Sequence, residues 1–409
     1  MPNGLISFWQ HYGGASRPEL TQALVNEYAE VEPELTISYE LTPIGQWDKK
    51  LTTALAAGSG PDMFTAADLN FTLFNERQWL APADPATFGV ADTAALVDLF
   101  LPASLNGLVV EDKLYGVPME YNVLHTYYRA DQFVEVGLDP AKPPTTWTEM
   151  GEYGQALTVR DDSGRMTRAG FQWPYRPPMS NEWPFRQFHP LVYQLGGDIL
   201  NEDNTECTLN TPEAERAAEV VLDFIVKYRC SELGYTIEDK NPEFWQERSS
   251  MDFEGPWGVG LGRATNPELF EGYPDSWWIT NFPTYGEETV RNMSPLWRYA
   301  YMVTATSPNP QDAWGFIDFV SRQQIRWLTE VGDFPARKGW EDDPIVETLP
   351  WLAIQLQDYP NAVPVPQTAK YFEIEEQVGQ ALERITTQTS GIKESLEEAT
   401  TRINEILAS

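Results

Sequence analysis

Basic residues are scarce in this sequence, and their shortage limits the partners that the protein can have. The 409 residues include 28 Lys and Arg against 61 Asp and Glu, which gives a formal net charge of −33 at pH 7. A surface this acidic repels a phosphate backbone, and the sequence has no basic patch with interleaved aromatic residues. We therefore expect no nucleic-acid partner, and we interpret the acidity as a well-solvated surface.

Cysteine and histidine are also rare, which argues against metal chemistry. Cys207, Cys230, His11, His125 and His189 show no metal-ligand spacing, so we expect no metal and no cofactor. Whether the two cysteines form a disulfide stays open. Exported chains often pair their cysteines, but a helix between these two would hold its ends about 25 Å apart at about 1.5 Å per residue.

Long apolar runs are missing as well. No stretch reaches the roughly 18 apolar residues that a membrane span needs. The start of the chain, MPNGLISFWQ, has no basic region and no apolar segment of useful length, and by itself it would indicate a cytosolic protein. The length exceeds what one hydrophobic core usually serves, so we expect two domains.

Aromatic residues are abundant, at 13 % of the chain with 15 Trp. Large exposed aromatic side chains are costly unless they pack or bind something, so we expect some to line a ligand site. The amino-terminal pattern predicts a β-α-β unit, in which a strand over 5–9 and a strand over 35–41 flank a helix that begins near Ser16. The loop 10–15 leaves the carboxyl end of the first strand, where open α/β sheets bind ligands.

A series of motifs resembles the extracellular solute-binding proteins of family 1, the maltose-binding-like receptors of ABC importers. The stretch LYGVPMEYNVLHTYYRADQFVEVGLDPAKPPTTW, 114–147, matches the family's crossover segment, with Arg129 and Ala130 as departures. Further matches follow in the family's order as GSGPDMFTAAD, GGDILN, LNTPEA, MDFEGPW, NPQDAWGFIDF, GDFPAR and the two carboxyl-terminal helices near 371–387 and 392–407. Each motif is weak alone, but their shared order along the chain is specific.

The resemblance implies a two-lobed α/β fold of the periplasmic-binding-protein type II, with a ligand cleft between the lobes. The amino-terminal lobe would comprise 1–119 plus about 293–332, and the carboxyl-terminal lobe about 120–292 plus 333–409. Crossovers would lie near 118–122, 288–299 and 332–337. Closure of the lobes would capture a di- or oligosaccharide and present it to ABC permease subunits. The resemblance also implies a monomer outside the cytoplasm, periplasmic or a cell-surface lipoprotein, whose secretion signal has been removed.

Sugar binding needs aromatic plates for the ring faces and fixed donors or acceptors for the hydroxyl rim. Glu120 and Asn122 are two residues apart, so on a strand they face the same side. We expect the aromatic stretch 170–194, which has no regular period, to be rich in loops, while Asp62 should hold a turn. The ligand-binding residues that we predict are Gln10, His11, Asp68, Glu120, Asn122, Trp173, Tyr175, Trp183, Trp257, Trp297, Arg298 and Arg337.

Two alternatives remain at this point. The same receptor could take a glycerophosphodiester, a polyamine or a peptide, and Arg298 and Arg337 leave a phosphate open. A glycan-active enzyme is the other alternative, although 61 acidic residues produce close carboxylate pairs by chance. The sequence has no nucleophile elbow, Gly-rich phosphate loop or metal motif, so we expect no catalysis.

Overall fold

The computed structural model describes residues 4–12, 16–173, 182–233 and 243–409. It divides into two compact units. The first unit is Met1–Asn122, Trp297–Leu349 and Gln367–Ala369, and the second is Val123–Leu296, Pro350–Pro366 and Lys370–Ser409. We expected the chain after 332 to lie in the second lobe, but the structure places 333–349 in the first unit. Hydrogen bonds from Arg17 to Asp333 and from Arg337 to Asp318 hold that segment there.

A five-stranded sheet with the order β2-β1-β3-β14-β6 forms the centre of the first unit. Its strands are β1 (Leu5–Tyr12), β2 (Thr36–Pro43), β3 (Met63–Ala67), β6 (Val117–Pro118) and β14 (Tyr299–Val303). β1 pairs in parallel with β2 and β3, which confirms the predicted β-α-β unit, and β14 pairs antiparallel with β3 and β6. The parallel strands therefore end at one edge of the sheet.

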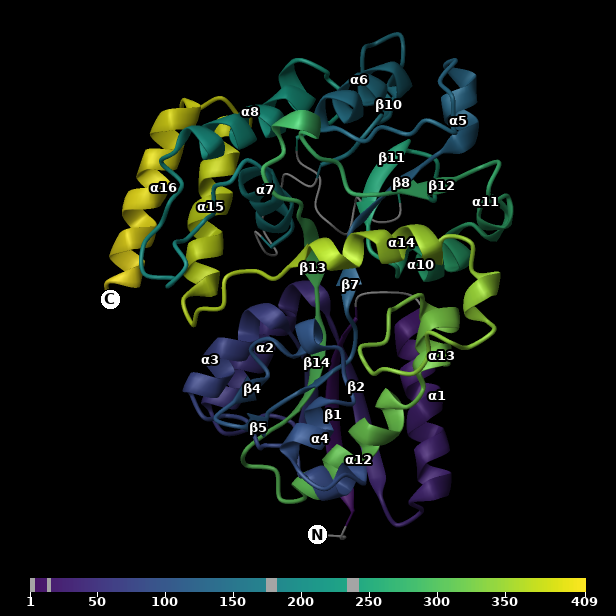
Figure 1. Cartoon of the computed structure of the whole chain (residues 1–409), viewed down its shortest axis with the longest axis vertical. Coiled ribbons are helices and arrows are strands. Elements are labelled where there is room, and N and C mark those ends of the chain that lie inside the picture. The colour runs from purple at the N-terminus through teal and green to yellow at the C-terminus, as the bar shows by residue number, and fades with distance from the viewer. Residues whose placement is uncertain (1–3, 13–15, 174–181, 234–242) are drawn as a thin grey trace. The chain divides into compact units, whose positions relative to one another are not determined.

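Helices lie on both sides of this sheet (Figure 1). They are α1 (Ser16–Val31), α2 (Ile44–Ala56), α3 (Phe71–Glu76), α4 (Thr93–Val97), α12 (Pro310–Ser321) and α13 (Gln324–Arg326). Phe8 contacts Phe316 of α12 on one side, and Phe64 contacts Phe74 of α3 on the other. Asp62 accepts hydrogen bonds from Ser7 and Ser307, which confirms its predicted structural role.

The second unit contains an antiparallel sheet with the order β11-β8-β12. Its strands are β8 (His125–Tyr128), β11 (Met251–Glu254) and β12 (Trp278–Thr280). Its helices are α5 (Ala130–Glu135), α6 (Trp147–Leu157), α7 (Glu182–Gln194), α8 (Pro212–Val226), α10 (Gly258–Thr265), α11 (Pro267–Glu271), α14 (Leu352–Asp358), α15 (Tyr371–Thr386) and α16 (Ile392–Leu407). The two predicted carboxyl-terminal helices are confirmed as α15 and α16.

The other strands are short. They are β4 (Val109–Val110), β5 (Lys113–Leu114), β7 (Asn122–Val123), β9 (Val159–Arg160), β10 (Met166–Arg168), β13 (Ser294–Trp297) and β15 (Ala362–Val363). They pair as the hairpins β4–β5 and β9–β10 and as a three-stranded sheet with the order β15-β13-β7. The chain passes from one unit to the other within β7 and β13.

The second unit contains a helix that the sequence did not predict. The stretch 170–194 was expected to be rich in loops, but its end forms α7, in which Phe185, Phe188 and Val192 are buried at helical spacing. Pro184 and Pro190 hid this pattern, because proline normally interrupts a helix. Pro184 lies in the first turn of α7, where a missing N–H costs no hydrogen bond, and Pro190 lies inside the helix.

Cys207 and Cys230 are both buried, and neither is in a disulfide.

Much of the aromatic content builds the core of the second unit. Tyr127, Phe244, Trp245 and Trp277 are fully buried in one cluster, with Ile279 of β12 among its members. The ring of Trp277 lies parallel to that of Tyr127, with 5.9 Å between centroids. Most of the free energy from burying these rings therefore stabilises the fold, and only part of the tryptophan set remains for ligand binding.

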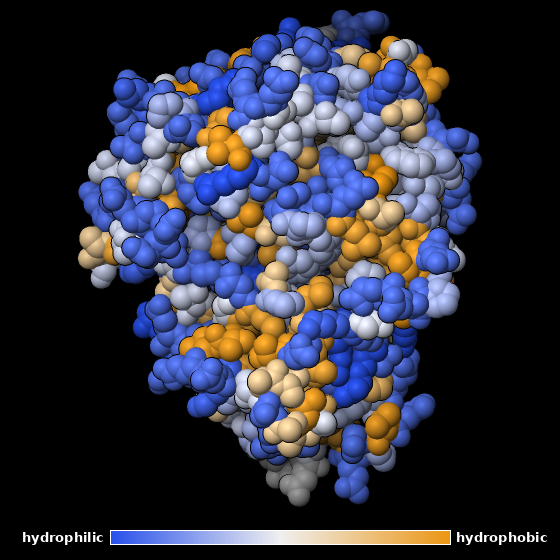
Figure 2. All heavy atoms as spheres, viewed as in Figure 1, coloured by the Kyte–Doolittle hydropathy of each residue, from blue (hydrophilic) through white to orange (hydrophobic). Residues whose placement is uncertain are grey.

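The surface agrees with the composition. Figure 2 shows hydrophilic residues over most of the visible face, with hydrophobic residues in separate patches. Within the part of the chain that the structure describes, each helix is too short or too polar to cross a bilayer.

A buried carboxyl group on α14 should make the stability of the second unit depend on pH. Asp358 accepts a hydrogen bond from the Phe282 backbone N–H at 3.0 Å, and its Oδ2 lies 3.6 Å from Nε2 of His125. Burial raises the pKa of Asp358 to about 6 and lowers the pKa of His125 to about 4. Since the pKa of Asp358 is raised on folding, its contribution is complete below about pH 4 and is lost as the pH rises through about 6.

We predict that Asp358→Asn removes this pH dependence. Between pH 4 and pH 7, the free energy of unfolding of the wild type should fall by about 3 kcal/mol more than that of the variant, from roughly two pKa units. Urea unfolding across this range measures the difference. The exposed Asp275→Asn should follow the wild-type curve, and a wild-type curve from Asp358→Asn would contradict the assignment.

Candidate functional site

The predicted polar residues of the first unit gather where its parallel strands end. Gln10 and His11 lie near the end of β1, and Asp68 follows β3 directly. Neighbouring residues of a strand face opposite sides, so Gln10 and His11 point in different directions. Gln10 accepts a hydrogen bond from the Tyr39 hydroxyl, while His11 stacks on Tyr299, with ring centroids 4.0 Å apart.

A buried ionic cluster occupies the His11 side of this edge. Arg17, at the start of α1, donates from Nε and Nη2 to Asp333 Oδ2, at 3.0 and 2.7 Å. Its Nη2 also donates to Glu120 Oε2. Asn122 completes the cluster, because its Nδ2 donates to Glu120 Oε2 at 3.0 Å and to Asp333 Oδ1 at 3.1 Å. The predicted common face of Glu120 and Asn122 is thus present.

The electrostatics of this cluster leave one acceptor unused. Burial raises the pKa of Glu120 well above its usual value, against the opposing effect of Arg17, while Asp333 raises it further. Burial lowers the pKa of Arg17, but Asp333 and Glu120 raise it by more, so the guanidinium stays charged. Among the described residues, Glu120 Oε1 has no hydrogen-bond partner. This oxygen is buried, and a ligand donor that reached it would supply the missing hydrogen bond.

His11 is neutral and has a defined tautomer. Its burial, followed by the nearby charge of Arg17, lowers its pKa well below the usual value. Arginine can only donate, so His11 Nε2 accepts from Arg17 Nη1 at 3.1 Å. The ring proton then sits on Nδ1, which donates to Thr65 Oγ1 at 3.2 Å. Both ring nitrogens of His11 are therefore committed to the protein.

The structure brings Asp68 and Arg298 together, but it gives the two predicted arginines structural partners. Arg298 Nε lies 3.5 Å from Asp68 Oδ2, and its Nη1 donates to the backbone oxygens of 103, 104 and 106. Arg337 Nη1 donates to Asp318 Oδ1 at 2.7 Å and to Ser321 Oγ at 2.6 Å. These contacts account for Arg337, and we do not keep it in the candidate ligand set.

In the second unit, Trp257 and Trp183 form an aromatic corner. Trp257 precedes α10, and its indole Nε1 donates to Glu254 Oε2 at 2.6 Å. The ring lies over Gly255, where an added Cβ would be 2.1 Å from it, so glycine is required there. Trp183 of α7 meets Trp257 edge to face, with centroids 6.5 Å apart and planes at 87°. Two rings at a right angle can hold a ring-shaped ligand at one corner.

A buried amide without a partner among the described residues lies on the same helix as Trp183. Gln187 is one turn further along α7, so the two side chains share a face of the helix. The Gln187 side chain is fully buried, and neither its Nε2 nor its Oε1 has a hydrogen-bond partner in the described part of the chain. A buried amide without partners is costly, which makes Gln187 a candidate for contact with a polar ligand.

The other predicted aromatic residues differ from this pair. Trp173 is 1 % exposed, and its ring packs against Trp147, Phe171 and Phe253, so it belongs to the core of the second unit. This packing corrects our prediction of Trp173 as a ligand residue. Trp297 ends β13 and is buried. Tyr175 lies outside the residues that the structure describes.

Comparison with known proteins identifies the family. A family model described as "Bacterial extracellular solute-binding protein" matches residues 14–325. The chain belongs to this family. The predicted family and the predicted two-lobed class of fold are therefore confirmed.

Relatives and solved structures agree with this membership. The chain is 32 % identical over 145 residues to the mannitol-binding protein of Pseudomonas aeruginosa, a match that covers 35 % of this chain and only about a third (32 %) of that relative. Maltose-bound MalE3 of T. maritima has a TM-score of 0.84 at 21 % identity, covering 98 % and 99 % of the two chains. UgpB of Mycobacterium tuberculosis in complex with glycerophosphocholine has 0.80 at 18 %, covering 99 % of each. At these identities the two structures show the fold.

Sequence reasoning missed two members of the ionic cluster of this solute-binding protein. We treated Arg17 only as part of a helix start, and we did not select Asp333 within the GDFPAR motif. They are 316 residues apart in the chain. A charged residue beside a predicted ligand loop was the available signal for Arg17, while only the fold shows that Asp333 is its partner. Within the described residues, no group of His, Cys, Asp or Glu side chains is arranged to hold a metal ion.

We predict that Arg17→Met strongly destabilises this solute-binding protein. The change leaves Glu120 and Asp333 buried beside each other without their shared cation, which typically costs about 3–5 kcal/mol. Urea unfolding of the variant measures this loss. The matched control is Arg326→Met, which removes ion pairs of a more exposed arginine with Glu27 and Glu330 and should cost about 1 kcal/mol or less. Equal losses in the two variants would contradict the role of the cluster.

Proposed function

We propose that this solute-binding protein captures a di- or oligosaccharide outside the cytoplasm and delivers it to the permease subunits of an ABC importer. The observation that carries the proposal is the aromatic corner of Trp257 and Trp183, with the carboxylate of Glu254 on the indole of Trp257. The amide of Gln187, which has no partner among the described residues, lies one turn along α7 from Trp183. Aromatic faces with a carboxylate and an amide suit a neutral sugar.

Each residue of the proposed ligand-binding set matches a chemical feature of a sugar. The C–H faces of a pyranose pack on aromatic rings, which is the role we assign to Trp257 and Trp183. Hydroxyl groups need acceptors and donors, because a polar group that enters a dry site unpaired loses the hydrogen bonds that it made with water. The unused Oε1 of Glu120 supplies an acceptor, and Gln187 supplies both kinds of group. Asp68 stays in the proposed set as a further acceptor.

The remaining features of the proposal concern the protein's way of working. Binding by the family's receptors involves no bond cleavage, so we propose that this protein is not an enzyme. We also propose that it acts as a monomer. Membership of an extracellular family supports a place outside the cytoplasm, in the periplasm or on the cell surface as a lipoprotein. The expected partners are the sugar and the permease.

A glycerophosphodiester is the second candidate, since UgpB with glycerophosphocholine shares the fold. A phosphate group would need arginine or backbone donors that converge on it. Arg337 Nη1 is used by Asp318 and Ser321, and Arg298 Nη1 by three backbone oxygens. The Nη1 atoms of both arginines are thus engaged by the protein, and the aromatic corner of Trp257 and Trp183 favours a neutral sugar as cargo.

We predict that Trp257→Ala weakens sugar binding by about 10- to 100-fold, because one stacking face is lost. A thermal-shift screen of the protein against di- and trisaccharides and glycerophosphodiesters would find the ligand, and calorimetry would measure its dissociation constant. At 100 times this constant, the ligand should stabilise the native state by about 2.7 kcal/mol. Trp278→Ala, in the same unit but outside the proposed set, should bind like the wild type. Turnover of the sugar, or a response to phosphodiesters alone, would contradict the proposal.

We predict opposite effects of Gln187→Met on stability and on binding. Removal of an unpaired buried amide should raise the free energy of unfolding of the free protein by about 1 kcal/mol. Loss of a ligand hydrogen bond should weaken sugar binding by about tenfold. Urea unfolding and calorimetry on the same preparation measure the two quantities. A variant with unchanged affinity would remove Gln187 from the ligand set, whatever its stability.

A further inference from the structure

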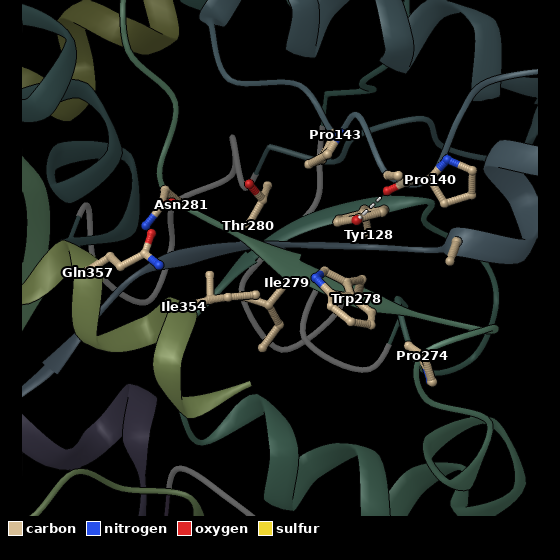
Figure 3. A pocket seen from close by; sticks show the side chains of 12 residues that line it. Tyr128, Pro140, Pro143, Pro274, Trp278, Ile279, Thr280, Asn281, Ile354 and Gln357 are labelled. Atoms are coloured by element: carbon tan, nitrogen blue, oxygen red, sulfur yellow. Dashed lines mark hydrogen bonds between the residues drawn. The ribbon is translucent and has the colours of Figure 1, made fainter. Parts of the chain in front are cut away.

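An open groove in the second unit shares no lining residue with the proposed sugar site. Its volume is about 520 Å³. Figure 3 shows β12 along the groove, with Pro140 and Pro143 on one side and Ile354 and Gln357 of α14 on the other. The residues that line it are Tyr128, Ala130, Pro140, Ala141, Pro143, Pro274, Trp278, Ile279, Thr280, Asn281, Ile354 and Gln357.

The floor of the groove is the free edge of a sheet. β12 is the last strand of the order β11-β8-β12, and among the described residues only β8 pairs with it. The groove touches four consecutive residues, 278–281, although side chains alternate between the two faces of a strand. The side chain of Ile279 is part of the aromatic core. A cavity that touches residues of both faces lies along the strand edge, where Trp278, Thr280 and Asn281 are partly exposed and Ile279 is buried.

The described residues that line the groove are all neutral. None of the twelve lining residues is acidic or basic, on a chain whose net charge is −33. The Tyr128 hydroxyl, the only ionisable group, donates to the backbone oxygen of Pro140 at 2.7 Å. Proline has no N–H group, so the Pro140–Pro143 wall offers apolar contact and few competing donors. A charged ligand would find no counter-ion among these twelve residues.

Both ends of the groove carry distinct groups. At one end, Trp278 stacks on Tyr273, with ring centroids 4.8 Å apart and planes at 13°, which fixes the indole that borders the groove. At the other end, the amides of Asn281 and Gln357 lie close together (Figure 3). A bare strand edge between a helix and a loop is the arrangement that binds extended peptides by strand addition.

We propose that this groove binds an extended, uncharged peptide segment of a partner protein. The segment adds to the free edge of β12 as a further strand, with apolar side chains between the proline loop and Ile354. Its backbone then forms the hydrogen bonds that β12 leaves unused, and the neutral lining selects against charged residues. The proposal does not depend on the identity of the transported solute.

The test uses a library of capped hexapeptides built from Val, Leu, Thr, Ser and Asn, added to the full chain with ¹⁵N-labelled tryptophan. We expect at least one peptide to shift the indole signal of Trp278, which Trp278→Phe identifies. N-methylation of alternate amides in that peptide should weaken its binding at least about tenfold, because it blocks the backbone donors. An active peptide that tolerates N-methylation would overturn strand addition.

Two variants of α14 locate the site. Gln357→Arg adds a charge to the groove wall and should weaken peptide binding at least about tenfold. Leu356→Arg is the matched control, because Leu356 is exposed on the same helix and does not line the groove, so it should bind like the wild type. Urea unfolding shows that both variants are folded. Equal binding by the two variants, silence of the whole library, or a shift of the Trp278 signal by a neutral sugar alone would overturn the proposal.

Discussion

The position of Arg17 between Glu120 and Asp333 is the constraint on which the first unit depends. Charges that leave water must be paired, and here one guanidinium serves two carboxylates, which Asn122 also joins. The three charged groups come from the start of α1, the segment after β6 and the segment before Trp340. Their pairing explains why 333–349 packs with the first unit.

The cluster also connects stability with binding. It holds a carboxylate whose pKa burial has raised, and it leaves Oε1 of that carboxylate without a partner among the described residues. A group held in this way is costly for the fold and useful for a ligand, because its position is fixed before the ligand arrives. His11 is held beside it in one tautomer, which fixes the hydrogen-bond pattern of the edge of the sheet.

The aromatic residues divide into two groups according to their surroundings. Trp173, Trp245 and Trp277 are enclosed by other rings and serve the core. Trp257 is only partly buried and is held by a carboxylate, while Trp278 borders the groove beside a free strand edge. Composition indicated a large aromatic content, but it could not divide the tryptophans into these groups, because their sequence patterns are alike.

Features that depend on neighbours along the chain could be predicted from the amino-acid order alone. The family motifs, the β-α-β unit, the turn at Asp62, the shared face of Glu120 and Asn122, and helices α15 and α16 all follow from short-range spacing. The folded chain was needed to show that Arg17 pairs with Asp333, that Trp173 is core, and that β12 has a free edge within the described residues. The physical reason is that the desolvation of a charge or a ring depends on which distant segments enclose it, and no local pattern records those segments.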